Sequence, residues 1–268
     1  MENNEERTSP LSNTSAYHLF GIDFAENPEQ KELIHLINED PYRRPVVYCK
    51  GNAGTGKTFA ALAGALAQVR GHGAKKRYKT VYYVREPVEM GHRLGYLKGK
   101  EEDKYAPYLG ALLDNYNHLM AFGKKSGIMP PPLRQPSNGK KGDEDPTMPQ
   151  EYLRLPSDII PLAPEFLRGR SFEDCIILVD EAQNLTLDEL QTIVTRIGNG
   201  CKMVILGSPN QIDIQGQTVE DNAFMLSYEI LKPTGLIGFV ELTKPMRSSF
   251  VSDFDQAFVN YKLTHPKK

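Results

Sequence analysis

The sequence predicts an α/β domain in which helices flank a mostly parallel β-sheet on both faces. A glycine-rich loop stands between a short β-branched run and an Ala-rich helical segment, in the order strand, loop, helix. Farther along, five apolar residues end in two carboxylates, as expected for a strand buried inside a parallel sheet. Helical and strand-like segments alternate along the chain, and this alternation favours a layered α/β fold.

The loop matches the pattern G-x-x-x-x-G-K-[ST] of phosphate-binding loops at every fixed position. Its glycines allow tight folding, so that successive N–H groups face an anion, and the next helix adds the positive end of its dipole. Lys57 is expected to reach the β- and γ-phosphates of a nucleotide, and the Thr58 hydroxyl to ligate Mg²⁺. The predicted nucleotide-binding residues of the loop are Gly51, Asn52, Ala53, Gly54, Thr55, Gly56, Lys57 and Thr58.

The elements around the loop follow from hydrophobic periodicity. Apolar residues at helical spacing predict a helix over residues 28–37, and a β-branched run predicts a strand at 45–49. The helix over 59–67 is apolar nearly all round, so it should be buried against the sheet. A second strand is expected at 81–84, and an irregular helical pattern covers 107–122.

Two stretches cannot contribute to a core. Residues 1–16 are polar, which predicts a disordered tail, and residues 128–150 are rich in Pro, Gly and charge, which predicts a surface insertion. A second phosphate-site element follows the insertion, so the insertion does not mark a domain boundary. We therefore expect a single domain over residues 17–268.

That second element is the run from 175 to 183, whose apolar part ends at Asp180 and Glu181. Catalytic residues of open α/β sheets lie at the carboxyl ends of strands, where these two carboxylates would emerge. Thr186 and Glu189 then form a capping box that starts a helix, and Gly198 is expected to end it. Further strands are predicted at 203–206 and 239–242, and a last helix over 254–261.

The chemistry that fits these residues is phosphoryl transfer from a nucleoside triphosphate. Asp180 is expected to hold Mg²⁺ through its water shell, and Glu181 to orient or deprotonate the attacking water. Gln211 follows another apolar strand and could sense the γ-phosphate, or else belong to a polar turn. Gln30 could pair with an adenine edge, or else be an ordinary glutamine on a helix surface.

Composition limits the remaining possibilities for the protein's ligands, its cysteine chemistry and its location. The chain has 268 residues and a net charge of −2, so no global basic field points to nucleic acid, and its small Lys/Arg clusters are typical of solvated loops. Its three cysteines match no metal-site or disulfide pattern, and the two that fall in predicted strands should be buried. We find neither a signal peptide nor a membrane-spanning run, and we expect a cytoplasmic location without membrane association.

Taken together, the motifs resemble those of the PhoH-like ATPase family, from about Pro28 to Tyr261. The chain departs from the family pattern at Ser208, where an Asp is common, and in the insertion at 128–150. After the second strand it reads Val-Arg-Glu-Pro at 84–87, where Thr-Arg-Pro is common. The matching segments are residues 51–58, 85–91, 94–97, 161–163, 168–172, 179–184, 195–198 and 207–213.

The resemblance implies a RecA-like core similar to the first lobe of superfamily 1 helicases, ATP and Mg²⁺ as ligands, and RNA or single-stranded nucleic acid as the macromolecular substrate. It also implies a homo-oligomeric ring, with a hexamer as one option. P-loop ATPases need a cation at the γ-phosphate in the transition state. A neighbouring subunit could donate Arg247, with Arg168 and Arg170 as further candidates, although each could equally form a surface ion pair.

The sequence thus favours an oligomeric, Mg²⁺-dependent ATPase that remodels or unwinds RNA, with Lys57, Glu181, Gln211 and Arg247 as catalytic residues. The alternative is an ATP-dependent regulatory or scaffold module with slow hydrolysis and no unwinding. A small-molecule kinase is a third interpretation, but neither a lid nor an acceptor pocket is evident in the sequence. No N-K-x-D guanine motif is present, which argues against a GTPase.

Overall fold

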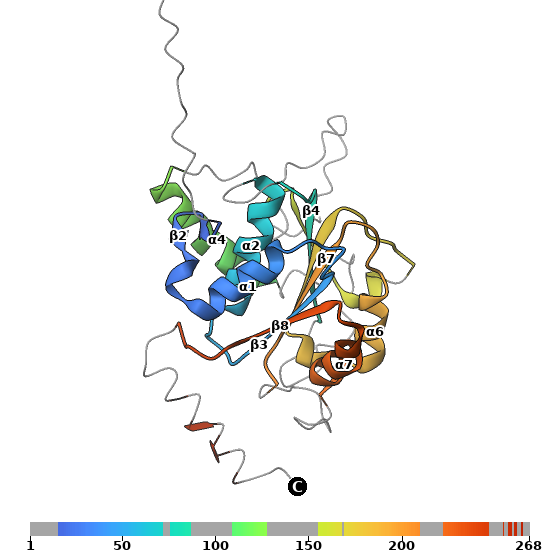
Figure 1. Ribbon diagram of the computed structural model, residues 1–268. Coiled ribbons are helices and arrows are strands. Elements are labelled where there is room, and N and C mark those ends of the chain that lie inside the picture. The colour runs from blue at the N-terminus through green and yellow to red at the C-terminus, as the bar shows by residue number, and fades with distance from the viewer. Residues whose placement is uncertain are drawn as a thin grey trace, which may run out of the picture.

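The computed structural model shows helices on both sides of a central sheet, as predicted (Figure 1). It describes residues 16–71, 76–86, 109–127, 155–167, 169–209 and 222–246, together with six helical positions between 254 and 264. The predicted tail, apart from residue 16, and the predicted insertion at 128–150 lie outside the described residues. Both therefore stay predictions.

The sheet has six strands, and every neighbouring pair is parallel. Across the sheet the strands lie in the order β5-β4-β6-β7-β3-β8, so that β7 separates β3 from β6. A short antiparallel pair, β1 (His18–Leu19) and β2 (Ile22–Asp23), stands apart from it. The six strands are β3 (Val46–Gly51), β4 (Thr80–Arg85), β5 (Ile159–Leu162), β6 (Cys175–Asp180), β7 (Lys202–Gly207) and β8 (Ile237–Leu242).

Each face of the sheet carries its own apolar core. The helices α1 (Pro28–Asn38), α2 (Lys57–Arg70) and α4 (Gly110–Lys125) contribute to one core, and α6 (Leu187–Val194) and α7 (Ala223–Leu231) to the other. The short 3-10 helices are η1 (Phe24–Glu26), η3 (Pro164–Leu167), η4 (Ala182–Asn184) and η5 (Lys232–Thr234).

The central strand β6 shows how the sequence produces this arrangement. All six of its residues are buried, and alternate side chains enter opposite cores, with Ile176 and Leu178 on one face and Ile177 and Val179 on the other. A strand covered on both faces must be apolar throughout, which is why period-two alternation is absent here.

The helix α2 meets the prediction of a buried Ala-rich segment, since all ten residues from Ala60 to Val69 are buried. Small side chains let it lie close to α1. A Cβ at Gly64 would come within 2.9 Å of the Ile34 side chain, so this glycine sets the distance between the two helices.

One prediction of local structure needs correction, and three elements were not predicted. The helix that begins after Thr186 ends at Val194, and Gly198 instead donates its N–H to the carbonyl of Phe172 beside the sheet. The strand β5 was not predicted; it contains Pro161, which is tolerated at the edge of the sheet. Neither α7 nor the β1–β2 pair was expected.

The three cysteines are free and buried, as predicted for Cys49 and Cys175, and the sulfurs of Cys175 and Cys201 lie 3.3 Å apart. The six described positions near the C-terminus are helical, in agreement with the expected last helix. Its aromatic side chains Phe254, Phe258 and Tyr261 are exposed.

Lys202 is fully buried at the start of β7. Its ammonium nitrogen donates to the carbonyls of Leu36, at 3.0 Å, and Arg44, at 2.7 Å. The Leu36 carbonyl lies in the last turn of α1, where the carbonyl oxygens have no N–H partner within the helix. Burial lowers the pKa of Lys202 to about 7. The neutral amine that forms above this pH still has two N–H groups, one for each of these two carbonyls.

This burial predicts a pH-dependent stability. Between pH 7 and 10.5 the unfolded chain binds one more proton at Lys202 than the folded chain, so the free energy of unfolding should rise with pH. From pH 7 to pH 9 the gain is about 2 kcal/mol. Chemical denaturation of wild type and Lys202→Met at both pH values measures it. Equal pH dependence in the two proteins would contradict this assignment.

Candidate functional site

The predicted phosphate-binding loop connects β3 to α2 at the carboxyl edge of the sheet. Gly54 and Gly56 adopt positive φ angles of 79° and 80°, which residues with side chains rarely adopt. A Cβ at Gly51 would lie 2.6 Å from the carbonyl of Leu242, and one at Gly56 would lie 2.7 Å from Nε2 of Gln30. The glycines are therefore required both by backbone conformation and by close packing.

Lys57 is the first residue of α2, and its ammonium group lies across the loop. Its Nζ donates to the carbonyls of Gly51, at 2.7 Å, and Asn52, at 3.0 Å, and to Oγ of Ser208 at 2.9 Å. Ser208 is buried, and its own hydroxyl donates to the Gly51 carbonyl. Burial lowers the pKa of Lys57. The Lys57 cation is thus held at the mouth of the loop by three oxygen atoms.

The carboxylate of Asp180 is almost fully buried at the end of β6. Its Oδ1 accepts a hydrogen bond from the Thr58 hydroxyl at 3.0 Å, and its Oδ2 accepts one from the Tyr83 hydroxyl at 2.6 Å. Arg85 lies 3.9 Å from the same Oδ2. A buried carboxylate needs such partners, and these come from two elements other than its own strand, α2 and β4.

Glu181 follows in a left-handed backbone conformation, with φ of 53°, which is uncommon for a residue with a side chain. Its Oε2 accepts from Nε2 of Gln183 at 2.5 Å. The other end of the same amide accepts from the backbone N–H of Ser208 at 2.9 Å, and Gln183 is fully buried. Gln183 therefore connects the carboxylate of Glu181 to the residue that holds Lys57.

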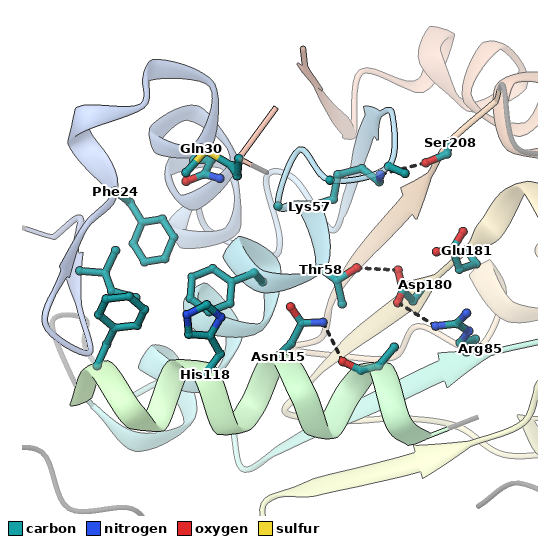
Figure 2. Close-up of a pocket in the computed structure, with 18 residues that line it drawn as sticks. Phe24, Gln30, Lys57, Thr58, Arg85, Asn115, His118, Asp180, Glu181 and Ser208 are labelled. Carbon is teal, nitrogen blue, oxygen red and sulfur yellow. Dashed lines mark hydrogen bonds and ion pairs between the residues drawn. The ribbon is translucent and has the colours of Figure 1, made fainter. Parts of the chain in front are cut away.

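One cavity of about 590 Å³, a volume typical of small-molecule sites, is lined by Lys57, Thr58, Arg85, Asp180, Glu181 and Ser208. Figure 2 shows the cavity in close-up, with Lys57 and Thr58 near the middle of the view. Three of the polar side chains lie at one end, namely Ser208, Glu181 and Arg85. At the opposite end lie Gln30, Phe24 and His118.

Four rings line that opposite end, and we call them the aromatic lobe: Phe24, Phe59, His118 and Phe122. They come from three segments, η1, α2 and α4. Neighbouring ring centroids are 5.2 to 6.1 Å apart, within the range of aromatic pairs. The cavity thus has a charged end and an aromatic end.

The structure brings most of the predicted site residues together. Lys57, Thr58, Asp180 and Glu181 all line the cavity. Gln30 lines it too and is buried, with Nε2 donating to the Thr55 carbonyl at 3.3 Å, so it is not an ordinary surface glutamine. The roles of all five residues remain predictions.

Other predicted residues do not join this group. Gln211, Arg247 and Arg168 lie outside the described residues. Arg170 is described, but it is exposed and does not line the cavity.

Sequence reasoning missed several residues of the site. Arg85 and Tyr83 lie at the carboxyl end of a predicted strand, so the position rule that selected Asp180 could have found them. Gln183 lies two residues after Glu181, and no sequence pattern marked it as a site residue. The rings of α4 could not be found, because only the packing of that helix beside α2 brings them to the cavity.

The donor set fits Mg²⁺ and a triphosphate. A hydroxyl and a carboxylate, here those of Thr58 and Asp180, are the hard oxygen ligands that Mg²⁺ takes in P-loop proteins, alongside phosphate oxygens and water. Within the described parts of the chain, no group of three or more His, Cys, Asp or Glu side chains could hold a metal by itself. A metal here would depend on the phosphates.

Over the same described ranges, none of the helices combines the length and apolar character that crossing a bilayer requires.

Comparison with known proteins identifies the family. A family model described as PhoH-like protein matches residues 24–259. The chain is 35% identical over 231 residues to Protein PhoH2 of Bacillus subtilis (strain 168), covering 86% of the chain and 46% of that protein. It is 30% identical over 236 residues to a PhoH-like protein of Mycobacterium tuberculosis (strain ATCC 25618 / H37Rv), covering 87% and 57%. The chain thus spans about half the length of these relatives.

Among solved structures, the chain resembles the large terminase of the thermophilic bacteriophage D6E. The TM-score is 0.50 at 11% sequence identity, covering 85% of this chain and 49% of the terminase. At this identity the likeness concerns the fold, and it agrees with the expected RecA-like P-loop core.

The contact between Tyr83 and Asp180 generates a prediction. Tyr83→Phe removes one hydroxyl from a buried carboxylate that we expect to hold Mg²⁺, and losing such an outer partner costs roughly 10- to 100-fold in metal affinity or activity. The Mg²⁺ concentration for half-maximal ATP hydrolysis should rise accordingly. Tyr82→Phe on the same strand is the control, since the Tyr82 ring packs against Phe172 in the core on the opposite face of the sheet. An unchanged Mg²⁺ requirement in Tyr83→Phe would refute the role.

Proposed function

The chain belongs to the PhoH-like protein family, and from that premise we propose that it hydrolyses ATP with Mg²⁺ and couples hydrolysis to remodelling or unwinding of RNA. Family membership supports an ATPase-type, nucleotide-binding function. The observation that carries the proposal is the convergence of Lys57, Thr58, Asp180 and Glu181 on one cavity.

The residues divide the work of phosphoryl transfer. The loop amides and Lys57 bind the β- and γ-phosphates, and Thr58 with Asp180 would hold Mg²⁺, which supplies neutralisation of phosphate charge. Glu181 orients a water whose oxygen attacks the γ-phosphorus as the bond to the β-phosphate oxygen breaks. The carboxylate of Glu181 accepts the proton of that water.

Gln183 supports this role of Glu181. Its amide fixes one carboxylate oxygen and is itself fixed by the Ser208 N–H, so Glu181 is held in a sparsely populated backbone conformation. Ser208, which departs from the family pattern, here serves to position Lys57. We propose no direct contact of Ser208 with the γ-phosphate.

The transition state also needs a cation at the γ-phosphate. Arg85 lines the cavity beside Asp180 and is one candidate within the same chain. Arg247, the residue proposed to act from a neighbouring subunit, follows Met246, whose N–H donates to the Gly54 carbonyl at 2.8 Å. We keep both candidates: Arg85 rests on its place in the cavity, whereas Arg247, the ring assembly and the role of Gln211 rest on the family resemblance.

The first test concerns Glu181. Glu181→Gln keeps the shape of the side chain but removes the base, so kcat for ATP hydrolysis should fall by roughly 10²- to 10⁴-fold while ATP affinity is retained. Phosphate release and equilibrium nucleotide binding measure the two quantities. Glu229→Gln on α7 is the matched control, because Glu229 is exposed in a surface ion pair with Lys232. Normal turnover in Glu181→Gln would exclude the proposed mechanism.

The second test concerns RNA. If hydrolysis is coupled to nucleic acid, single-stranded RNA should raise kcat, and ATP and RNA should change each other's affinity by the same factor. Hydrolysis and fluorescence anisotropy assays with single-stranded RNA and DNA measure both effects. No response to either nucleic acid, with slow basal turnover, would favour the regulatory module instead. A phosphorylated acceptor among the products would favour a kinase.

A further inference from the structure

The aromatic lobe takes no part in the phosphate chemistry, yet it opens into the same cavity as the phosphate-binding loop. Phe59 directly follows Thr58 in α2, so the first ring of the lobe lies one residue from the expected magnesium ligand. The rings of Phe24 and His118 both pack against Phe59, with centroids 6.1 and 5.5 Å from the Phe59 centroid. The row of rings therefore begins at the phosphate site and leads away from it.

The rings differ in exposure in a way that suits a ligand surface. Phe24 is 2% exposed and forms a buried support. His118 is exposed and stacks on Phe122 at 5.2 Å with an interplanar angle of 23°, while Phe122 is 37% exposed. Aromatic side chains in a pre-arranged, partly exposed row on a cavity wall form a platform on which a planar ring can stack.

The position of α4 is held from both sides. A Cβ on Gly21, in the turn between β1 and β2, would overlap Ser126 at the end of this helix, so hairpin and helix are in close contact. On its other side Tyr116 lies 5.6 Å beneath the Arg70 guanidinium of α2. The rings on α4 are thus presented by a packed helix and not by a loose loop.

A second wall near this end carries Gln30, a polar side chain, and Met246, an apolar one. Gln30 is fixed there by its hydrogen bond to the Thr55 carbonyl, and Met246 by its N–H to the Gly54 carbonyl. A flat group between the two walls would have a stacking surface on one side and an amide edge on the other. A nucleobase has both complementary features, a π-face and hydrogen-bonding edges.

We propose that the aromatic lobe is the base subsite of the nucleotide site, with the nucleobase of the bound nucleoside triphosphate stacked against His118 and its neighbouring rings. The proposal rests on the proposed function for the identity of the ligand. It assigns α4, which carries none of the phosphate motifs, a direct role in nucleotide affinity. A base belonging to RNA is the competing occupant, and it is disfavoured because the lobe begins beside Thr58 inside the nucleotide cavity.

The test compares a ligand with a base to one without. Calorimetry gives the dissociation constants of Mg·ADP and Mg·pyrophosphate for wild type, His118→Ala, His118→Phe and Asn117→Ala. His118→Ala should weaken ADP binding roughly 5- to 100-fold and leave pyrophosphate binding unchanged. His118→Phe restores a ring and should restore ADP affinity. Asn117 is exposed on the same helix and does not line the cavity, so Asn117→Ala should match wild type.

Three results would overturn the base subsite. They are unchanged ADP affinity in His118→Ala, an equal loss for ADP and pyrophosphate, and loss of single-stranded RNA binding with ADP binding intact. The last result would assign the lobe to a nucleic-acid base. Because His118 is exposed, its replacement should not prevent folding, and circular dichroism confirms this for each variant.

The result for the base subsite can be told apart from the result for the proposed ATP hydrolysis. If wild type binds ADP in a His118-dependent manner but does not hydrolyse ATP, the proposed hydrolysis fails and the base subsite stands. If ATP is hydrolysed and the affinity for ADP does not depend on His118, the base subsite alone fails. If wild type binds neither ligand, both fail.

Discussion

The buried carboxylate of Asp180 is the contact on which the rest of the site depends. Removing a charge from water is costly unless hydrogen bonds or an ion pair compensate it. Here the compensation comes from Thr58 on α2 and from Tyr83 and Arg85 on β4, elements that no local sequence pattern links. Satisfying this one carboxylate therefore aligns the start of the phosphate-binding helix with two strand ends.

The strand order makes the alignment possible. Because β7 lies between β3 and β6, the end of β7 places Ser208 next to the loop on one side and next to the carboxylates on the other. A continuous path of hydrogen bonds then runs from Lys57 through Ser208 and Gln183 to Glu181. The group that binds phosphate and the group that we expect to position water are thus parts of one network, in which a shift of either would disturb the other.

The sequence was informative wherever a feature depends on neighbours in the chain. The loop, the apolar strand that ends at Asp180, and the helix 59–67 could all be predicted, since their residues are contiguous. Prediction failed where tertiary position overrides local preference. Pro161 argues against a strand but is acceptable at a sheet edge, and Gly198 could end a helix but instead pairs beside the sheet. Gln30 is a different case, because its sequence position allowed two interpretations and only packing against the loop decides between them.

The two ends of the cavity differ in origin, and this explains why one was predictable and the other was not. The charged end is built at the carboxyl edge of the sheet, from residues that immediately follow strands or begin α2. The aromatic end is built from η1, the side of α2 and α4, whose spacing in the sequence is unrelated to their contact. Phosphate chemistry constrains the first set tightly, because amides, cation and metal ligands must meet at fixed distances. Stacking constrains the second set less, because any ring of suitable size on a packed helix provides a surface. The charged end is therefore the part of the site that short motifs can reveal, whereas the aromatic end emerges only when the helices are packed.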